Sequence, residues 1–259
     1  MSSRLSNWLR RRQIWRSIFR QGLPRDDPSR AAVIASNVFL HVHPAAMRKS
    51  GFALSFTWCM GGITFLLFLV EVVTGILLMF YYRPTAEHAY FDIQDLRAQV
   101  SFGLVREVHR WGGHAMVITI WLHMLRVFLT GSYKPPREFN WVVGVVLLVL
   151  TMFLSFTGYL LPWDQLSMWA VTVGSQMAAA TPLIGAEGPL SSFLQIDGVP
   201  LIHRGNDVRF ALLGGTAVGP ATLLRFYVLH CVFVPVVAAV LIAVHFWRIR
   251  KDGGISGPL

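Results

Sequence analysis

Four long apolar runs constrain this chain more than any other feature of its sequence. They cover residues 54–82, 112–130, 141–161 and 226–247, and charged side chains almost never interrupt them. A helix needs about 20 apolar residues to cross the hydrocarbon core of a bilayer. A soluble core could bury one such run, but four of them in 259 residues predict an all-α integral membrane protein. The expected helices cover about residues 54–82, 108–131, 140–161 and 222–248.

The basic residues are distributed unevenly between the two expected sides of the membrane. A net charge of +10 could indicate a nucleic-acid partner, but 15 basic residues fall on the N-terminal lead, the turn between the second and third spans, and the tail. Four crossings place these three segments on one side, whereas the connections on the other side carry five basic and eight acidic residues. The positive-inside rule therefore predicts cytoplasmic termini in a bacterial inner or photosynthetic membrane, with no nucleic-acid partner.

The chain divides by composition into a basic lead, residues 1–50, and a membrane domain, residues 51–259. Residues 5–19 alternate bulky apolar and arginine positions at helical spacing, which predicts an amphipathic helix lying on the membrane surface; a disordered basic arm is the alternative for its outer part. The connection between the third and fourth spans is about 60 residues long. Its segment 166–180 is semi-apolar and too short to cross, so we expect a second interfacial helix there.

Four of the nine histidines form a pattern along the second and fourth spans. His109 and His123 are 14 residues apart, which places them on one helical face about 21 Å apart. His230 and His245 are 15 residues apart, about 60° out of alignment and about 22 Å apart. Because one span separates the two helices, both run in the same direction. We therefore expect His109 to pair with His230 near the outer surface and His123 with His245 near the inner surface.

Each histidine pair can bind one haem iron from both sides. Two axial imidazoles leave no open position for oxygen or substrate, so such a haem transfers electrons. The glycines support this interpretation, because the first span has Gly61 and Gly75 and the third has Gly144 and Gly158, again 14 residues apart. A porphyrin packed in a four-helix bundle needs missing side chains where it meets its neighbours, although ordinary helix packing also uses small residues.

Haem propionates need cationic or hydrogen-bonding partners. Arg110 follows a predicted ligand directly, Arg126 lies one turn beyond His123, and Arg225 precedes His230 by five residues. Arginine at membrane depth is costly and usually paired. These three residues, together with Arg250 of the tail, are candidate propionate partners, and snorkelling to the membrane surface is the alternative.

Several motifs resemble the split-type cytochrome b family of the Rieske/cytochrome b complexes, that is, cytochrome b6 of b6f-like complexes in a bacterial version. The resemblance covers most of residues 35–180 and 220–259. It rests on the segments Cys59-Met-Gly-Gly-Ile-Thr64, Phe80-Tyr-Tyr-Arg-Pro-Thr85, Val108-His-Arg-Trp111, Lys134-Pro-Pro-Arg-Glu138, Gly158-Tyr-Leu-Leu-Pro-Trp-Asp-Gln165, Leu224-Arg-Phe-Tyr-Val-Leu-His230 and Ile255-Ser-Gly-Pro-Leu259.

The resemblance implies a subunit of a proton-translocating quinol:cytochrome c or plastocyanin-type oxidoreductase, inactive alone. Two b haems would carry electrons from an outer quinol-oxidation site to an inner quinone-reduction site. The implied partners are a subunit-IV-like second half of cytochrome b, a Rieske iron–sulfur protein, a cytochrome c-type acceptor, quinone and membrane lipid, in a homodimeric complex. The expected lining of the outer quinol site is Phe156, Tyr159, Trp169 and Ala170. The outer connection, residues 183–220, is longer than in the plastid proteins.

The most specific expectation from the resemblance concerns Cys59. An apolar-helix cysteine is usually inert, but the matching cysteine of the family forms a single thioether to an additional c-type haem beside the inner b haem. Two other functions stay open from the sequence: the haem b membrane anchor of a hydrogenase or formate dehydrogenase, and a haem-free transport or structural subunit. The segment Pro162-Trp-Asp-Gln165 and the matched glycines oppose the first, and the paired histidines oppose the second.

Overall fold

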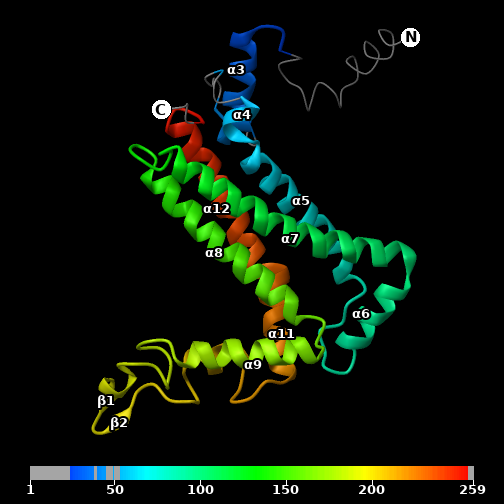
Figure 1. Cartoon of the computed structure of the whole chain (residues 1–259), viewed down its shortest axis with the longest axis vertical. Coiled ribbons are helices and arrows are strands. Elements are labelled where there is room, and N and C mark those ends of the chain that lie inside the picture. Colours follow the sequence, from blue (N-terminus) through cyan, green and yellow to red (C-terminus); the bar gives the residue numbers. More distant parts are fainter. Residues whose placement is uncertain (1–23, 38–39, 45–48, 50–52, 256–259) are drawn as a thin grey trace. The chain divides into compact units, whose positions relative to one another are not determined.

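The computed structural model describes residues 24–37, 40–44, 49 and 53–255, and four of its helical segments are long and apolar enough to cross a membrane (Figure 1). Only 11% to 28% of each apolar window is buried within the chain, so most of this apolar surface is left for lipid or partner subunits. The all-α membrane fold expected from the sequence is confirmed. The four spans are Met60–Met79, Val100–Leu129, Glu138–Leu160 and Pro220–Lys251.

The chain separates into two compact units, which are described separately. The first unit comprises Met1–Trp58, Phe128–Val143 and Ile242–Leu259, and the second comprises Cys59–Val127 and Gly144–Leu241. The second unit therefore contains most of each span and the long outer connection. Over their full lengths, its helices and short strands are α5 (Met60–Met79), α6 (Ala89–Ala98), α7 (Val100–Leu129), α8 (Glu138–Leu160), α9 (Gln165–Ala179), η3 (Ser191–Phe193), β1 (Gln195–Ile196), β2 (Val199–Pro200), α10 (Val208–Leu213), α11 (Pro220–Val228), η4 (Leu229–Phe233) and α12 (Val234–Lys251). Three of these helices, α7, α8 and α12, extend into the first unit.

The first unit contains α3 (Asp27–Ser36), η1 (Leu40–Val42) and α4 (Leu54–Thr57), together with the turn between α7 and α8 and the end of α12. The guanidinium of Arg137 in that turn donates to the carbonyls of Asp252 and Gly254 at 2.9 and 3.1 Å. Arg248 pairs with Asp252 at 2.8 Å. These contacts tie the turn to the C-terminal tail. The amphipathic helix expected at residues 5–19 lies outside the described residues.

The spans differ from the sequence-based boundaries at their ends. The first was expected to begin at residue 54, but Trp58 and Cys59 adopt positive φ angles of 50° and 51°, which separates the short α4 from α5. The left-handed region is uncommon for residues other than glycine. The second span begins at Val100, eight residues before the expected start. In the fourth, α11 and α12 are joined by a π turn at Leu229–Phe233.

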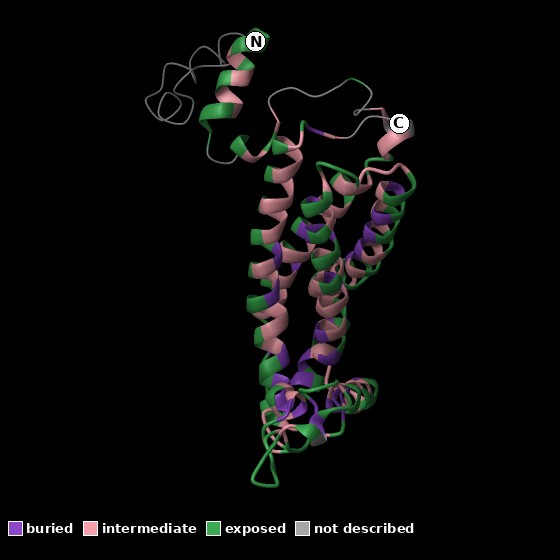
Figure 2. Cartoon of the chain, turned by 90° about the vertical axis from the view of Figure 1, so that its left-hand side faces the viewer, coloured by how far each residue is buried: buried purple, intermediate pink, exposed green. Residues whose placement is uncertain are grey.

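The best-packed part of the second unit lies at the end where α8 gives way to α9. A cluster of buried side chains from α8, α9, α10 and α11 fills this region: Leu160, Val171, Leu213 and Phe226. Buried residues gather there in Figure 2, and α9 runs across the ends of α8 and α11 in Figure 1. Asp164 caps α9 by accepting from the Ser167 amide at 2.8 Å. The helix expected at residues 166–180 is therefore present, and it is not one of the membrane spans.

Candidate functional site

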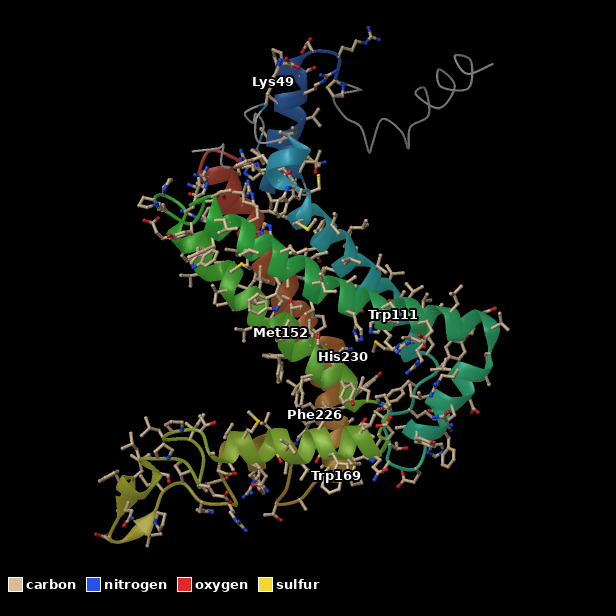
Figure 3. All side chains as sticks on the ribbon, in the orientation of Figure 1. Lys49, Trp111, Met152, Trp169, Phe226 and His230 are labelled. Carbon is tan, nitrogen blue, oxygen red and sulfur yellow. The ribbon has the colours of Figure 1, made fainter. Side chains whose placement is uncertain are left out.

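Two of the predicted ligands, His109 of α7 and His230 of the π turn, face each other in the second unit. Their ring centroids are 6.1 Å apart and their planes are at 84°. His230 lies well inside the span, four residues beyond Phe226 (Figure 3). An imidazole nitrogen binds a first-row metal at about 2 Å and the ring centre lies about 1 Å behind it, so two axial imidazoles on one iron have centres roughly 6 Å apart. The observed separation fits a shared iron.

The Nδ1 atom of His230 is held by two groups of α8. The Thr157 hydroxyl lies 3.2 Å from it and the Leu154 carbonyl 3.1 Å. Thr157 Oγ1 also bonds the Phe153 carbonyl at 2.9 Å. Because a hydroxyl has one proton and a carbonyl can only accept, Nδ1 of His230 is the donor to the Thr157 oxygen. Nε2 is then the unprotonated nitrogen that can bind a metal.

His109 is held in a matching way by α5. Thr74 Oγ1 lies 2.9 Å from its Nδ1 and donates to the Val70 carbonyl at 2.7 Å. In addition, Oε2 of Glu71 lies 3.1 Å from Nδ1. Both rings therefore donate from Nδ1 and leave Nε2 for a ligand.

Glu71 was missed by the sequence analysis, which described its apolar run as nearly uncharged. The signal that could have found it was its isolation, because it is the only ionisable residue of α5. An ionisable residue inside a span is expensive in lipid and usually marks a functional position.

Three of the four predicted glycines lie against the histidine rings. A Cβ on Gly75 would approach Cε1 of His109 to 3.2 Å, and one on Gly158 would approach Cε1 of His230 to 2.5 Å. A Cβ on Gly61 would lie 3.2 Å from Cε1 of His123. These glycines thus provide room for the imidazoles themselves as well as for anything the imidazoles bind. Gly144, the fourth, is buried.

The π turn at Leu229–Phe233 accounts for the longer histidine spacing of the fourth span. His230 and His245 are 15 residues apart, one more than the pair on the second span. A π turn holds one residue more than an α turn, and such turns are common at functional sites. The extra residue is therefore accommodated beside His230.

The second histidine pair is divided between the two units. His123 belongs to the second unit and His245 to the first. Their pairing stays a prediction. Among the described residues, no group of three or more histidine, cysteine or acidic side chains could hold a bare metal ion. A haem needs only two axial protein ligands, because its porphyrin supplies the others, so the His109–His230 pair suits a haem.

The candidate propionate arginines contact protein groups. Arg110 pairs with Glu107 at 2.5 Å, Arg225 donates to the Ala211 carbonyl at 2.5 Å, and Arg250 donates to the His41 carbonyl. Arg126 is buried, at 7% exposure. None of these contacts tests propionate binding, which stays a prediction.

The four residues expected at the outer quinol site divide into two partly buried and two exposed members. Phe156 and Ala170 pack against the cluster at the α8–α9 end, where the Phe156 ring meets that of Phe226 edge-on at 6.1 Å. Tyr159 and Trp169 are 51% and 63% exposed. Exposed aromatics at this end are consistent with a site that another subunit completes.

Cys59 is the residue before α5 and has an exposed side chain. The sequence analysis placed it one turn inside the helix, whereas the structure places it at the N-terminal boundary. It is not in a disulfide. Such a position leaves the thiol accessible to a group outside the helix.

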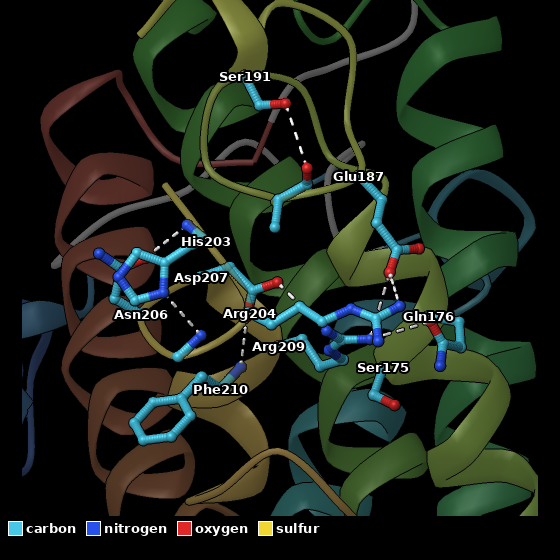
Figure 4. A network of polar contacts seen from close by, with 12 residues as sticks. Ser175, Gln176, Glu187, Ser191, His203, Arg204, Asn206, Asp207, Arg209 and Phe210 are labelled. Carbon is cyan, nitrogen blue, oxygen red and sulfur yellow. Dashed lines mark hydrogen bonds and ion pairs between the residues drawn. The ribbon is translucent and has the colours of Figure 1, made fainter. Parts of the chain in front are cut away.

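Part of the outer connection is ordered by a buried arginine. Arg209 of α10 is 4% exposed, and its guanidinium donates to Gln176 of α9 at 3.2 Å and lies 3.6 Å from Glu187 (Figure 4). Glu187 also pairs with Arg204 at 2.9 Å. This network fastens the connection to α9.

Comparison with known proteins gives consistent matches. A family model described as "Cytochrome b/b6/petB" matches residues 47–195. The curated cytochrome b6 of Cyanidium caldarium is 44% identical over 203 residues, which are 78% of this chain and 85% of that protein. A solved structure described as "Hyperthermophilic respiratory Complex III" superposes with a TM-score of 0.66 at 24% identity, covering 97% of this chain. The present chain spans 56% of that chain, and this likeness concerns the fold alone.

Proposed function

The chain belongs to the cytochrome b/b6 family, and we propose that it is the di-haem cytochrome b subunit of a quinol-oxidising Rieske/cytochrome b complex. The observation that carries the proposal is the 6.1 Å separation of the His109 and His230 rings. The family implies haem b, and its four apolar helices make the chain an integral membrane protein. This membership favours a cytochrome b over a hydrogenase anchor or a haem-free transporter.

The residues have distinct roles in this proposal. His109 and His230 hold the outer haem, and His123 and His245 hold the inner one. When bound, the two haems supply one-electron transfer across the membrane, from an outer quinol-oxidation site to an inner quinone-reduction site. Because each iron has two imidazole ligands, neither offers an open position for another reaction. Arg110, Arg126, Arg225 and Arg250 are the candidate partners of the propionates.

Phe156, Tyr159, Trp169 and Ala170 form this chain's share of the outer quinol site. Tyr159 and Trp169 are exposed at the end that holds the outer histidine pair, which supports completion of the site by a second cytochrome b half. The remaining proposed partners are a Rieske iron–sulfur protein and a cytochrome c-type acceptor, in a homodimeric complex. The charge distribution supports cytoplasmic termini, so quinol protons are released on the opposite side.

Isolation of the native complex through a tag on this chain tests the proposal. We expect a reducible b-type spectrum, the EPR signal of a Rieske cluster and quinol-dependent reduction of a cytochrome c. A nickel or molybdenum subunit in the complex, or the lack of a b-type spectrum, contradicts the proposal.

We also propose a covalent c-type haem attached through one thioether to Cys59. The exposed thiol at the start of α5 supports it. Haem staining of the denatured subunit on a gel should show covalent haem in the wild type and none in Cys59→Ser. Covalent haem that survives Cys59→Ser, or that is missing from the wild type, overturns this assignment.

A further inference from the structure

Glu71 is the only ionisable side chain of α5, and it lies beside one predicted iron ligand. Its side chain is 17% exposed, and its Oε2 is 3.1 Å from Nδ1 of His109. Its second oxygen, Oε1, is buried and has no hydrogen-bond partner among the described residues. Burying a carboxylate without full compensation is costly. An ionisable group kept at this position therefore calls for a function.

The neighbouring helix leaves a slot for this carboxylate. A Cβ on Gly112 of α7 would lie 2.1 Å from Oε1 of Glu71, which no real structure could accommodate without displacing the side chain. Gly113 follows, and a Cβ there would lie 3.9 Å from Oε2. Gly112 is also three residues beyond His109, on the same side of α7. Helix α7 thus provides both the predicted ligand, His109, and the space at Gly112 that accommodates the Glu71 side chain.

Among the described residues, no carboxylate pairs with the partner ligand, His230. Glu71 lies three residues before Thr74, and Leu154 lies three residues before Thr157. Each threonine hydroxyl contacts the Nδ1 atom of its histidine. The second contact is the Leu154 carbonyl at His230 but the Glu71 carboxyl group at His109, so the two ligands of one iron would differ in this acceptor.

We propose that Glu71 is a positioning residue that acts on the outer haem through His109. Its carboxylate keeps Nδ1–H of His109 turned toward α5, and it makes the imidazole a stronger electron donor. An acceptor at Nδ1–H favours oxidised over reduced iron, because the electron density it adds to the imidazole stabilises the more positive oxidised centre. Glu71 therefore lowers the reduction potential of the haem that His109 and His230 hold. This inference rests on the proposed function.

Redox titration of the purified complex, monitored by its optical spectrum, tests the inference with Glu71→Leu and Glu71→Gln. Removal of the polar contact with His109 in Glu71→Leu should favour reduction of the outer haem about tenfold, which is about 59 mV for one electron. Glu71→Gln keeps a neutral polar group, so we expect about threefold, or roughly 30 mV. Asp95→Asn removes an exposed charge from α6 and should leave the potential unchanged.

A second readout keeps the test informative if Glu71→Leu does not assemble. Gly112→Ala displaces the carboxylate without removing it, and it should raise the potential in the same direction as Glu71→Gln. The EPR spectrum of the oxidised haem reports the angle between the imidazole planes, and it should change in Glu71→Leu as His109 loses its support.

Two results overturn the inference and leave the proposed function standing. One is a wild-type b-type spectrum with an outer-haem potential that is unchanged or lowered in Glu71→Gln and Glu71→Leu. The other is an equal rise in Asp95→Asn, because the effect is then not specific to the contact with His109. A wild-type complex with no b-type haem instead contradicts the proposed function, and the inference fails with it.

Discussion

The α5 side and the α8 side of the outer histidine pair use the same local arrangement but differ in tightness and in one acceptor. Each presents a Thr-Gly dipeptide, Thr74-Gly75 on α5 and Thr157-Gly158 on α8. The α8 side is tighter, since a Cβ on its glycine would lie 2.5 Å from the ring rather than 3.2 Å. The α5 side places the Glu71 carboxyl group at Nδ1, where the α8 side places a backbone carbonyl. The packing and the hydrogen bonding of the two ligands can therefore be varied independently.

The threonines explain why both rings have the same orientation. A threonine hydroxyl in a helix can donate to a carbonyl of the preceding turn, and here both do. Because its proton is already donated, each hydroxyl oxygen can only accept a hydrogen bond from the histidine Nδ1–H. Thr74 of α5 and Thr157 of α8 thus orient the two Nε2 atoms in the same way.

Substitution of the two glycines should give the largest difference in haem retention between the α5 and α8 sides. Gly158→Ala brings a Cβ to 2.5 Å from a buried imidazole, whereas Gly75→Ala brings one only to 3.2 Å. Overpacking of this kind costs about 1–3 kcal/mol. We expect Gly158→Ala to lose most of the outer haem and Gly75→Ala to retain it. Optical quantification of haem b per chain checks this, and equal losses in both variants contradict the difference in tightness.

Substitution of the two threonines should give a smaller difference in haem retention between the two sides. Thr74→Val leaves His109 with the carboxyl group of Glu71, whereas Thr157→Val leaves His230 with the Leu154 backbone carbonyl. A lost hydrogen bond costs about 1 kcal/mol, and we expect the cost to be lower where a side chain that can adjust its position remains as acceptor. Thr157→Val should therefore release the outer haem at lower denaturant concentration than Thr74→Val. The reverse order means that Glu71 does not support His109.

The segment that follows α5 should give the smallest effect, which is a change of folding stability with pH. Arg83 hydrogen-bonds the buried carboxylate of Asp92 at 2.6 Å, and this holds the pKa of Asp92 below its usual range. Because the folded pKa is depressed, the stabilisation is present above pH about 4, the unfolded value, and is lost as the pH falls through the folded pKa. The exposed Arg83 side chain keeps the effect small.

Thermal unfolding of the detergent-solubilised complex between pH 3 and 7 checks this expectation. The wild type should lose stability at the acidic end, and Asp92→Asn should be less stable at neutral pH but less sensitive to acid. An Asp92→Asn variant with the acid sensitivity of the wild type assigns that sensitivity to another group.

The sequence predicted the parts of this structure that depend on long, regular patterns. Hydropathy located the four spans, and the 14-residue interval singled out His109 and Gly75 because helical periodicity makes such positions share a face. It did not locate the break at Trp58 and Cys59, where positive φ angles occur in residues that rarely adopt them. The π turn around His230 has no sequence signature.

The sequence analysis missed Glu71 because an averaged apolar run hides one carboxylate. Its partners, Gly112 and His109, lie on another helix, so the slot appears only when two spans are packed together. Phe156 and Ala170, which the resemblance places at the outer quinol site, pack against one cluster, and their contact with quinol stays a prediction. The exposure of Tyr159 and Trp169 depends on chains outside this sequence, which no intrachain pattern specifies.

The most direct test of the account is the number of b haems per chain in complexes carrying wild-type His109 and His109→Ala. If His109 and His230 hold one iron and His123 and His245 another, the wild-type complex contains two b haems per chain and the variant retains only the inner one. A His109→Ala complex that keeps both b haems, or a wild-type complex that contains none, contradicts the assignment of the outer pair.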